Sequence, residues 1–215
     1  KTVQAMFYCR KDWGEYLKAA RREVLRKPPK ASTHCESWYG FFSGFLAAKH
    51  YPDRREDQVV SSYLEETLPL IWDREKMRPK TAPSRIQNWS ALISVLVDKY
   101  ECNPSQNKDD LLCASEIGDF LITTQTDDGA YRNHGVHYTC VIYVAKSMLE
   151  LCEAEKMSGD AVLMRKAEAH YASAKRAVEE LTVNLECIGT EGEHTLEDGM
   201  IACSALQIAA FALTL

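Results

Sequence analysis

A short run near the middle of the chain carries the side chains best suited to acid–base chemistry. His134 and His137, followed by Tyr138, supply groups that can exchange a proton near neutral pH. Arg132 and Asn133 precede them and could bind a carboxylate and offset its charge. β-Elimination beside the carboxylate of a uronic acid needs these parts: a group that neutralises the carboxylate, a base, and an acid for the leaving oxygen. The run therefore predicts this reaction, with an oligo- or polysaccharide as substrate.

Carboxylates in two other places offer a second chemistry. A glycoside hydrolase uses a pair of carboxyl groups that flank the bond it cleaves. One could come from Asp127 or Asp128, and the other from Glu197 or Asp198. The plainer interpretation is that carboxylates are common at helix starts, where the helix dipole favours them, and that the segment around Gly129 is a turn.

Polar and aromatic residues also gather directly before four predicted helices, at 33–39, 85–89, 127–138 and 191–199. Sugars suit such surroundings, because their apolar faces stack on aromatic rings while their hydroxyls need donors and acceptors. The expected substrate-binding residues are His34, Glu36, Trp38, Asn88, Trp89, His137, Glu193 and His194. The alternative is that the carboxylates cap helices and that both tryptophans belong to the core.

The helices that follow these runs are marked by apolar residues at helical spacing. Trp38, Phe41, Phe42, Phe45 and Leu46 line one helical face, and similar stripes start at Trp89, Tyr138 and Met200. The copies begin about 50 residues apart, with a longer last interval. Such a period is typical of an array of supersecondary units.

Helices with charged outer faces alternate with these four. They are predicted near 12–26, 56–72, 108–124 and 160–183, and the last has an apolar stripe through Met164, Ala167, Tyr171, Ala174, Val178 and Leu181. Proline and capping residues mark the boundaries, and no stretch has the pattern of a sheet. The sequence thus predicts an all-α fold in one domain over 1–215, with hairpins at about 12–49, 56–100, 108–153 and 160–214. If the inner helices are parallel, all four polar runs meet at one rim.

Composition sets the outer limits of this interpretation. With 26 Lys+Arg against 31 Asp+Glu and no long block of either sign, nucleic acid is not an expected partner. No apolar run has the roughly 20 residues of a membrane span. The chain has eight cysteines, of which Cys113, Cys140, Cys152 and Cys203 fall in apolar helical stretches, so we expect them buried and reduced. No cysteine or histidine spacing fits a zinc site, and no metal or cofactor is expected.

The hairpin alternation with polar inner-helix starts resembles the (α/α) toroids of six-hairpin glycosidases and of the alginate lyase and heparinase II/III-like families. Asn133-His134-Gly135 with Tyr138 is similar to the Asn-Asn-His-Gly-x-x-Tyr stretch of some alginate lyases. The resemblance implies that Asn133 contacts the substrate carboxylate and that His134 takes the proton. Arg132 stands where that stretch has its first Asn, and the families' distant catalytic Tyr has no located counterpart here.

A second resemblance concerns the segment before this run. Gln125-x-x-Asp128-Gly129-x-Tyr131 is similar to the Gln-x-x-Asp-Gly-x-Trp repeats of terpene cyclase-type toroids, with Tyr in place of Trp. The repeat ties hairpins together in that family. It occurs once here, and the Asp-rich ionising motif of those enzymes has no match. The resemblance therefore favours a ring and not terpene chemistry.

Four hairpins are fewer than the six or seven that close such rings. Together with a first residue that is not Met, this predicts a piece of a larger polypeptide, an incomplete barrel. The leading hypothesis is a polysaccharide lyase. The alternatives are a six-hairpin glycoside hydrolase and a non-catalytic toroid or solenoid that binds glycan or protein. Location stays open: glycan degradation favours a secreted or periplasmic enzyme, whereas reduced cysteines oppose an oxidising compartment.

Overall fold

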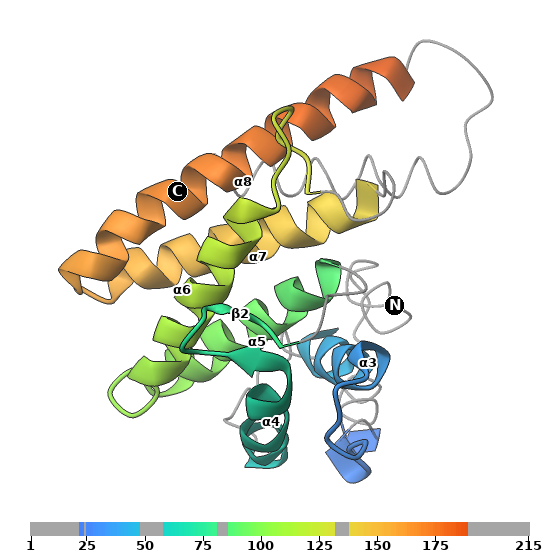
Figure 1. Ribbon diagram of the computed structural model, residues 1–215, viewed down its shortest axis with the longest axis vertical. Helices are drawn as coiled ribbons and strands as arrows, with labels where there is room; N and C mark the ends of the chain where they lie inside the picture. The colour runs from blue at the N-terminus through green and yellow to red at the C-terminus, as the bar shows by residue number, and fades with distance from the viewer. Residues whose placement is uncertain (1–21, 24, 48–57, 81–85, 132–137, 189–215) are drawn as a thin grey trace, which may run out of the picture. The chain divides into compact units, whose positions relative to one another are not determined.

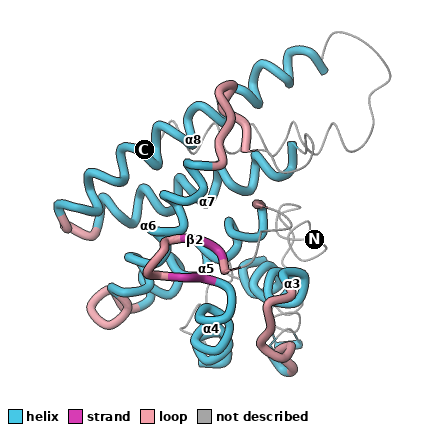
Figure 2. Tube along the Cα trace, viewed as in Figure 1, coloured by secondary structure: helices cyan, strands magenta, loops and turns pink. Residues whose placement is uncertain are grey.

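A computed structural model of the chain describes residues 22–23, 25–47, 58–80, 86–131 and 138–188 (Figure 1). The chain divides into two compact units, 1–83 and 84–215. Helices dominate the described residues of both units (Figure 2). The all-α prediction is therefore confirmed as a fold class.

Unit 1 is built on helices α3 (Cys35–Ala47) and α4 (Gln58–Ile71). The predicted aromatic stripe of α3 is confirmed, since Trp38, Phe41, Phe42 and Phe45 are each 6% exposed or less. The rings of Phe41 and Phe42 lie 4.5 Å and 5.6 Å from the ring of Tyr63 on α4. Tilted and edge-on rings at these separations are favourable, so aromatic contacts hold these two helices together.

A small β-hairpin follows α4 in unit 1. Strand β1 (Trp72–Asp73) pairs antiparallel with β2 (Arg78–Pro79), in the register Trp72 to Pro79 and Asp73 to Arg78. The Asp73 carboxylate accepts the backbone N–H of Lys76 at 3.1 Å within the turn. The expectation of no sheet is thus wrong for this segment, because strands of two residues are too short to show an alternating pattern.

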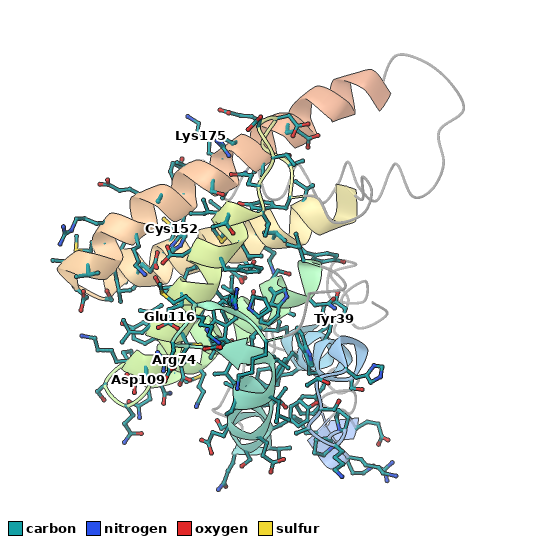
Figure 3. The ribbon with its side chains drawn as sticks, viewed as in Figure 1. Tyr39, Arg74, Asp109, Glu116, Cys152 and Lys175 are labelled. Atoms are coloured by element: carbon teal, nitrogen blue, oxygen red, sulfur yellow. The ribbon has the colours of Figure 1, made fainter. Side chains whose placement is uncertain are left out.

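Unit 2 contains helices α5 (Gln87–Cys102), α6 (Lys108–Thr123), α7 (Tyr138–Met157) and α8 (Ala161–Ile188). The stripe of α5 is confirmed, since Trp89, Leu92, Ile93, Leu96 and Val97 are at most 3% exposed. Cys113 on α6 and Cys152 on α7 are buried free thiols, as predicted, and Figure 3 labels Cys152. The apolar stripe of α5 and these two cysteines belong to the core of the unit.

Ion pairs and the short turn between α7 and α8 show the directions of the four helices. Lys99 near the end of α5 pairs with Asp110 near the start of α6 at 3.1 Å, so these helices are antiparallel. Lys108, at the start of α6, pairs with Asp160, just before α8, at 3.0 Å. Asp119, near the end of α6, pairs with Lys166 on α8 at 2.6 Å, so α6 and α8 run in the same direction. The turn 158–160 joins α7 to α8, and the two helices pack against each other in antiparallel fashion. Consequently α5 and α7 also run in the same direction.

The buried stripe of α8 differs from the predicted one. Leu163, Ala167, His170, Ala174 and Ala177 are at most 1% exposed, whereas Met164 is 47% exposed. Alanines on neighbouring helical rows make two stripes possible from sequence alone, and the contact with α6 and α7 selects one of them. The predicted stripe was therefore displaced around the helix. The predicted start at 160 lies within one residue of the observed start, whereas α8 extends to Ile188, beyond the predicted end at 183.

Other helix bounds agree with the predictions at 56–72 and 108–124. The helix near 12–26 falls mostly outside the described residues, and the stripe from Met200 falls wholly outside them. Within the described part of the chain, no helix is both long enough and apolar enough to cross a membrane.

Candidate functional site

The predicted acid–base run lies between the described parts of unit 2. Arg132, Asn133, His134 and His137 are outside the described residues, and Tyr138 is the first residue of α7. The candidate residues of the fourth run, which are Glu193, His194, Glu197 and Asp198, are also outside them. What the structure does describe is the segment that leads into the run.

That segment is a loop, 124–131, that connects α6 to the run and lies against α8 (Figure 2). The amide group of Gln125 makes the central contacts. Its Nε2 donates to the carbonyls of Gly129 at 2.7 Å and Ser173 at 2.8 Å. Its Oε1 accepts from Ser173 Oγ at 2.8 Å and from Arg176 Nη2 at 2.5 Å. One side chain thus closes the loop on itself and joins it to α8.

Tyr131 provides the second attachment of the loop. It is 1% exposed, and its hydroxyl shares a hydrogen bond of 2.6 Å with Ser173 Oγ. Burial disfavours the phenolate and raises the pKa of Tyr131 to about 12, even though the bond to Ser173 and the charge of Arg176 act in the opposite direction. The phenol therefore stays neutral at ordinary pH and serves as an anchor.

Gly129 allows the loop to approach α8 closely. Its φ is +94°, and a Cβ at this position would lie 2.7 Å from the carbonyl oxygen of Arg176. Glycine adopts positive φ without steric cost and has no side chain to collide with the helix. The turn interpretation of this segment is confirmed at Gly129.

The two aspartates of the loop have different surroundings. Asp128 Oδ1 accepts from Thr126 Oγ1 and from the backbone N–H of Ala130, the latter at 3.4 Å, so this carboxylate belongs to the turn. Asp127 is exposed beside it. Both aspartates that the hydrolase hypothesis names here are exposed, and the carboxylate of Asp128 is also engaged in the turn.

The motif Gln125-x-x-Asp128-Gly129-x-Tyr131 thus acts as a structural tie, as its resemblance to the toroid repeats implies. Gln125 and Tyr131 both reach Ser173 on α8, the second helix after α6 in the chain. The tie fixes the end of α6 against α8 and sets the point from which the acid–base run begins.

Helix direction places the starts of α5 and α7 toward the same end of unit 2. Because α5 and α7 are parallel and α6 is antiparallel to both, the starts of α5 and α7 lie at the end where α6 finishes. The contact between the rings of Trp89, in the first turn of α5, and Phe120, in the last turn of α6, shows this directly, with centroids 6.3 Å apart. Residues 132–137 of the third run lie outside the described residues, so the convergence of the runs on one rim stays a prediction.

The remaining predicted binding residues differ in exposure. Trp38, Asn88 and Trp89 are 2%, 3% and 3% exposed, so both tryptophans are core residues, as the alternative interpretation expected. A ring that is covered in this way offers no free face for a sugar. His34 is exposed before α3, and Glu36 lies in the first turn of that helix.

Two polar groups of unit 2 were not singled out by the sequence analysis. Ser94 on α5 donates to the carboxylate of Glu150 on α7 at 2.6 Å, which also pairs with Lys146 at 3.4 Å. His170 on α8 is fully buried between Glu155 and Asp119. The sequence carries one signal for His170: it stands at helical spacing from Leu163, Ala167, Ala174 and Ala177, in a row that is otherwise apolar.

Among the described residues, no group of three or more histidines, cysteines or carboxylates is placed to hold a metal ion. Comparison with known proteins gave no match to any protein family, curated protein or solved structure.

Proposed function

We propose that this chain is part of an (α/α) toroid that cleaves glycosidic bonds of a polysaccharide by β-elimination at a uronic acid. The observation that carries the proposal is the tie of Gln125 and Tyr131 to Ser173, which fixes the loop directly before the run Arg132–Tyr138. A catalytic group is effective only when the elements around it hold it in place. Here the chemistry predicted from the sequence follows a firmly anchored loop.

Helix topology supports the toroid part of the proposal. Inner helices α5 and α7 are parallel and pack against each other, and α6 and α8 are parallel and also in contact. Two layers of parallel helices, connected in alternation, are the repeating unit of an (α/α) ring. Further hairpins of the same kind would continue the two layers towards closure.

In the proposed reaction, Arg132 and Asn133 bind the uronic acid carboxylate and offset its charge. His134 takes the proton from the carbon next to that carboxylate, and the electron pair forms a carbon–carbon double bond as the bond to the glycosidic oxygen breaks. Tyr138 supplies a proton to the leaving oxygen. The products are one chain with a new end and one with an unsaturated uronate.

The test is to incubate the full-length protein with a panel of acidic and neutral polysaccharides. Ultraviolet absorbance reports the unsaturated uronate, and a reducing-end assay reports cleavage. The proposal expects both signals, and expects both to vanish in the double variant His134→Ala/Tyr138→Phe. Tyr171→Phe, a partly exposed tyrosine on α8, is the matched control that should retain activity.

Other outcomes point to the other candidates. Reducing ends without absorbance would indicate a hydrolase, for which Asp127→Asn, Glu197→Gln and Asp198→Asn are the next variants. Absence of both signals on every polysaccharide, together with binding to one of them, would replace the lyase proposal with a glycan-binding toroid. Full activity of the double variant would also overturn the lyase assignment.

A further inference from the structure

His170 occupies an unusual position in the core of unit 2. It lies on the face of α8 that packs against α6 and α7, and its side chain is 0% exposed. The neighbours in its helical row, Ala167 and Ala174, are small and fully buried. A buried titratable group needs partners, because desolvation otherwise removes its charge.

Carboxylates face both nitrogens of the His170 ring. Nδ1 lies 2.8 Å from Oε2 of Glu155 on α7, and Nε2 lies 3.3 Å from Oδ1 of Asp119 on α6. The other oxygen of Asp119 pairs at 2.6 Å with Nζ of Lys166, which is on α8 one turn before His170. These are the charged groups that face the ring from the helices around it.

Gly118 makes room for the ring on α6. A Cβ at this position would lie 2.8 Å from Nε2 of His170 and 2.6 Å from Cδ2 of Leu151. The absence of a side chain there lets three helices close around one imidazole.

The protonation state of the ring decides how well it satisfies these partners. A neutral imidazole donates from one nitrogen only, whereas the imidazolium donates from both. Burial lowers the pKa of His170, but hydrogen bonds and charge from Asp119 and Glu155 outweigh it, so that the pKa is raised above the usual value of about 6.5. Burial also disfavours the charged form of Asp119 and by itself raises the pKa of its carboxyl. Hydrogen bonds and charge from His170 and Lys166 nevertheless keep that pKa below the ordinary value.

We propose that His170 is a pH-dependent clasp: as the imidazolium it fastens α8 to Glu155 of α7 and Asp119 of α6, and so holds the loop that ends at Tyr131. The link to the loop is short, since Ser173 and Arg176, which bind Gln125, follow His170 on the next turns of α8. The clasp does not depend on the proposed lyase activity.

The sign of the pH dependence follows from the direction of the shift. Because the pKa of His170 is higher in the folded chain than in the unfolded one, its stabilisation is complete below the unfolded pKa of about 6.5. It is lost as the pH rises through the folded pKa. A pH above the folded pKa of His170 should therefore loosen the packing of α8 and the loop.

The experiment has a direct part and a mutational part, both on the full chain. NMR of the ring nitrogens follows the titration of His170, assigned by its absence in His170→Gln. Urea unfolding is measured over the same pH range for wild type, His170→Gln, Glu155→Gln and the control His34→Gln, whose histidine is exposed in unit 1. Hydrogen exchange at the Gly129 amide, which donates to the Thr126 carbonyl at 2.9 Å, reports on the loop.

We expect a His170 titration midpoint above about 6.5 that moves downward in Glu155→Gln. The urea midpoint of wild type and His34→Gln should fall as the pH passes that titration, and Gly129 should lose protection over the same interval. His170→Gln should lack this fall. A midpoint below about 6.5, or an equal pH dependence in wild type and His170→Gln, would overturn the proposal; the wild-type NMR titration stands even if Glu155→Gln fails to fold.

Discussion

Tyr131 and Ser173 lie 42 positions apart in the chain and share a hydrogen bond of 2.6 Å between their side-chain oxygens. Ser173 Oγ also donates to Gln125 at 2.8 Å, so a single serine on α8 meets both ends of the loop 124–131. The connection between the loop after α6 and α8 therefore depends on a few polar atoms, and each can be tested.

Removing the hydroxyl of Tyr131 should weaken this connection. Tyr131→Phe keeps the buried ring but loses the hydrogen bond to Ser173, which should lower the free energy of unfolding by about 1 kcal/mol. Urea unfolding measures the change. Tyr39→Phe, at a partly exposed tyrosine of unit 1, is the control, and an equal effect of the two substitutions would contradict the assigned role (Figure 3).

The same phenol should make the chain sensitive to high pH. The pKa of Tyr131 is raised to about 12 from 10.0, so between these values the unfolded chain releases a proton that the folded chain retains. Stability should fall as the pH rises through this interval, by about 2–3 kcal/mol at most for a shift of this size. Because this loss exceeds the advantage of about 1 kcal/mol at neutral pH, the stabilities of wild type and Tyr131→Phe should approach each other and then cross within this interval. Curves that stay parallel from neutral pH upward would refute the prediction.

Gly129 should not tolerate a side chain. Gly129→Ala places a methyl group where φ is +94° and where the Arg176 carbonyl oxygen would be 2.7 Å away. We expect a loss of about 1–3 kcal/mol in the free energy of unfolding, measured by urea or heat. Gly40→Ala is the matched control, because a Cβ there meets nothing within 4 Å and alanine favours the helix by up to about 1 kcal/mol.

Gly118 should be equally restrictive for a different reason. In Gly118→Ala the methyl group would meet Leu151 at 2.6 Å and His170 at 2.8 Å inside the core. Overpacking of this kind typically costs about 1–3 kcal/mol and outweighs the gain in helix propensity. Thermal unfolding beside Gly40→Ala separates the two effects, and a stabilised Gly118→Ala would show that the helices can move apart without cost.

Local patterns determined most of the helical architecture. The aromatic row of α3 and the apolar row from Trp89 repeat at helical spacing, and spacing is a property of neighbouring residues that the sequence displays directly. The boundaries near 108–124 and 160 follow in the same way from proline, asparagine and aspartate between the helices. The tie from Gln125 to Tyr131 was likewise visible as a motif.

Tertiary contacts decided which of several compatible faces was used. Met164 and Leu163 both belong to plausible apolar rows of α8, and only the approach of α6 and α7 buries the row that contains His170. The imidazole ring of His170 lies in that row, and helical spacing alone does not predict which side chains it contacts. Its partners, Glu155 and Asp119, come from two other helices, so their distances depend on how the helices cross.

The sequence by itself thus determined that the chain is a succession of helices, and that a glycine-containing motif forms the loop before the predicted acid–base run. Only the tertiary structure decided that Ser173 receives this loop, that Trp38 and Trp89 are covered, and that an imidazole joins three helices. The physical reason is that helical periodicity is set within a few residues, whereas burial and pairing between distant side chains are set by the packing of whole helices.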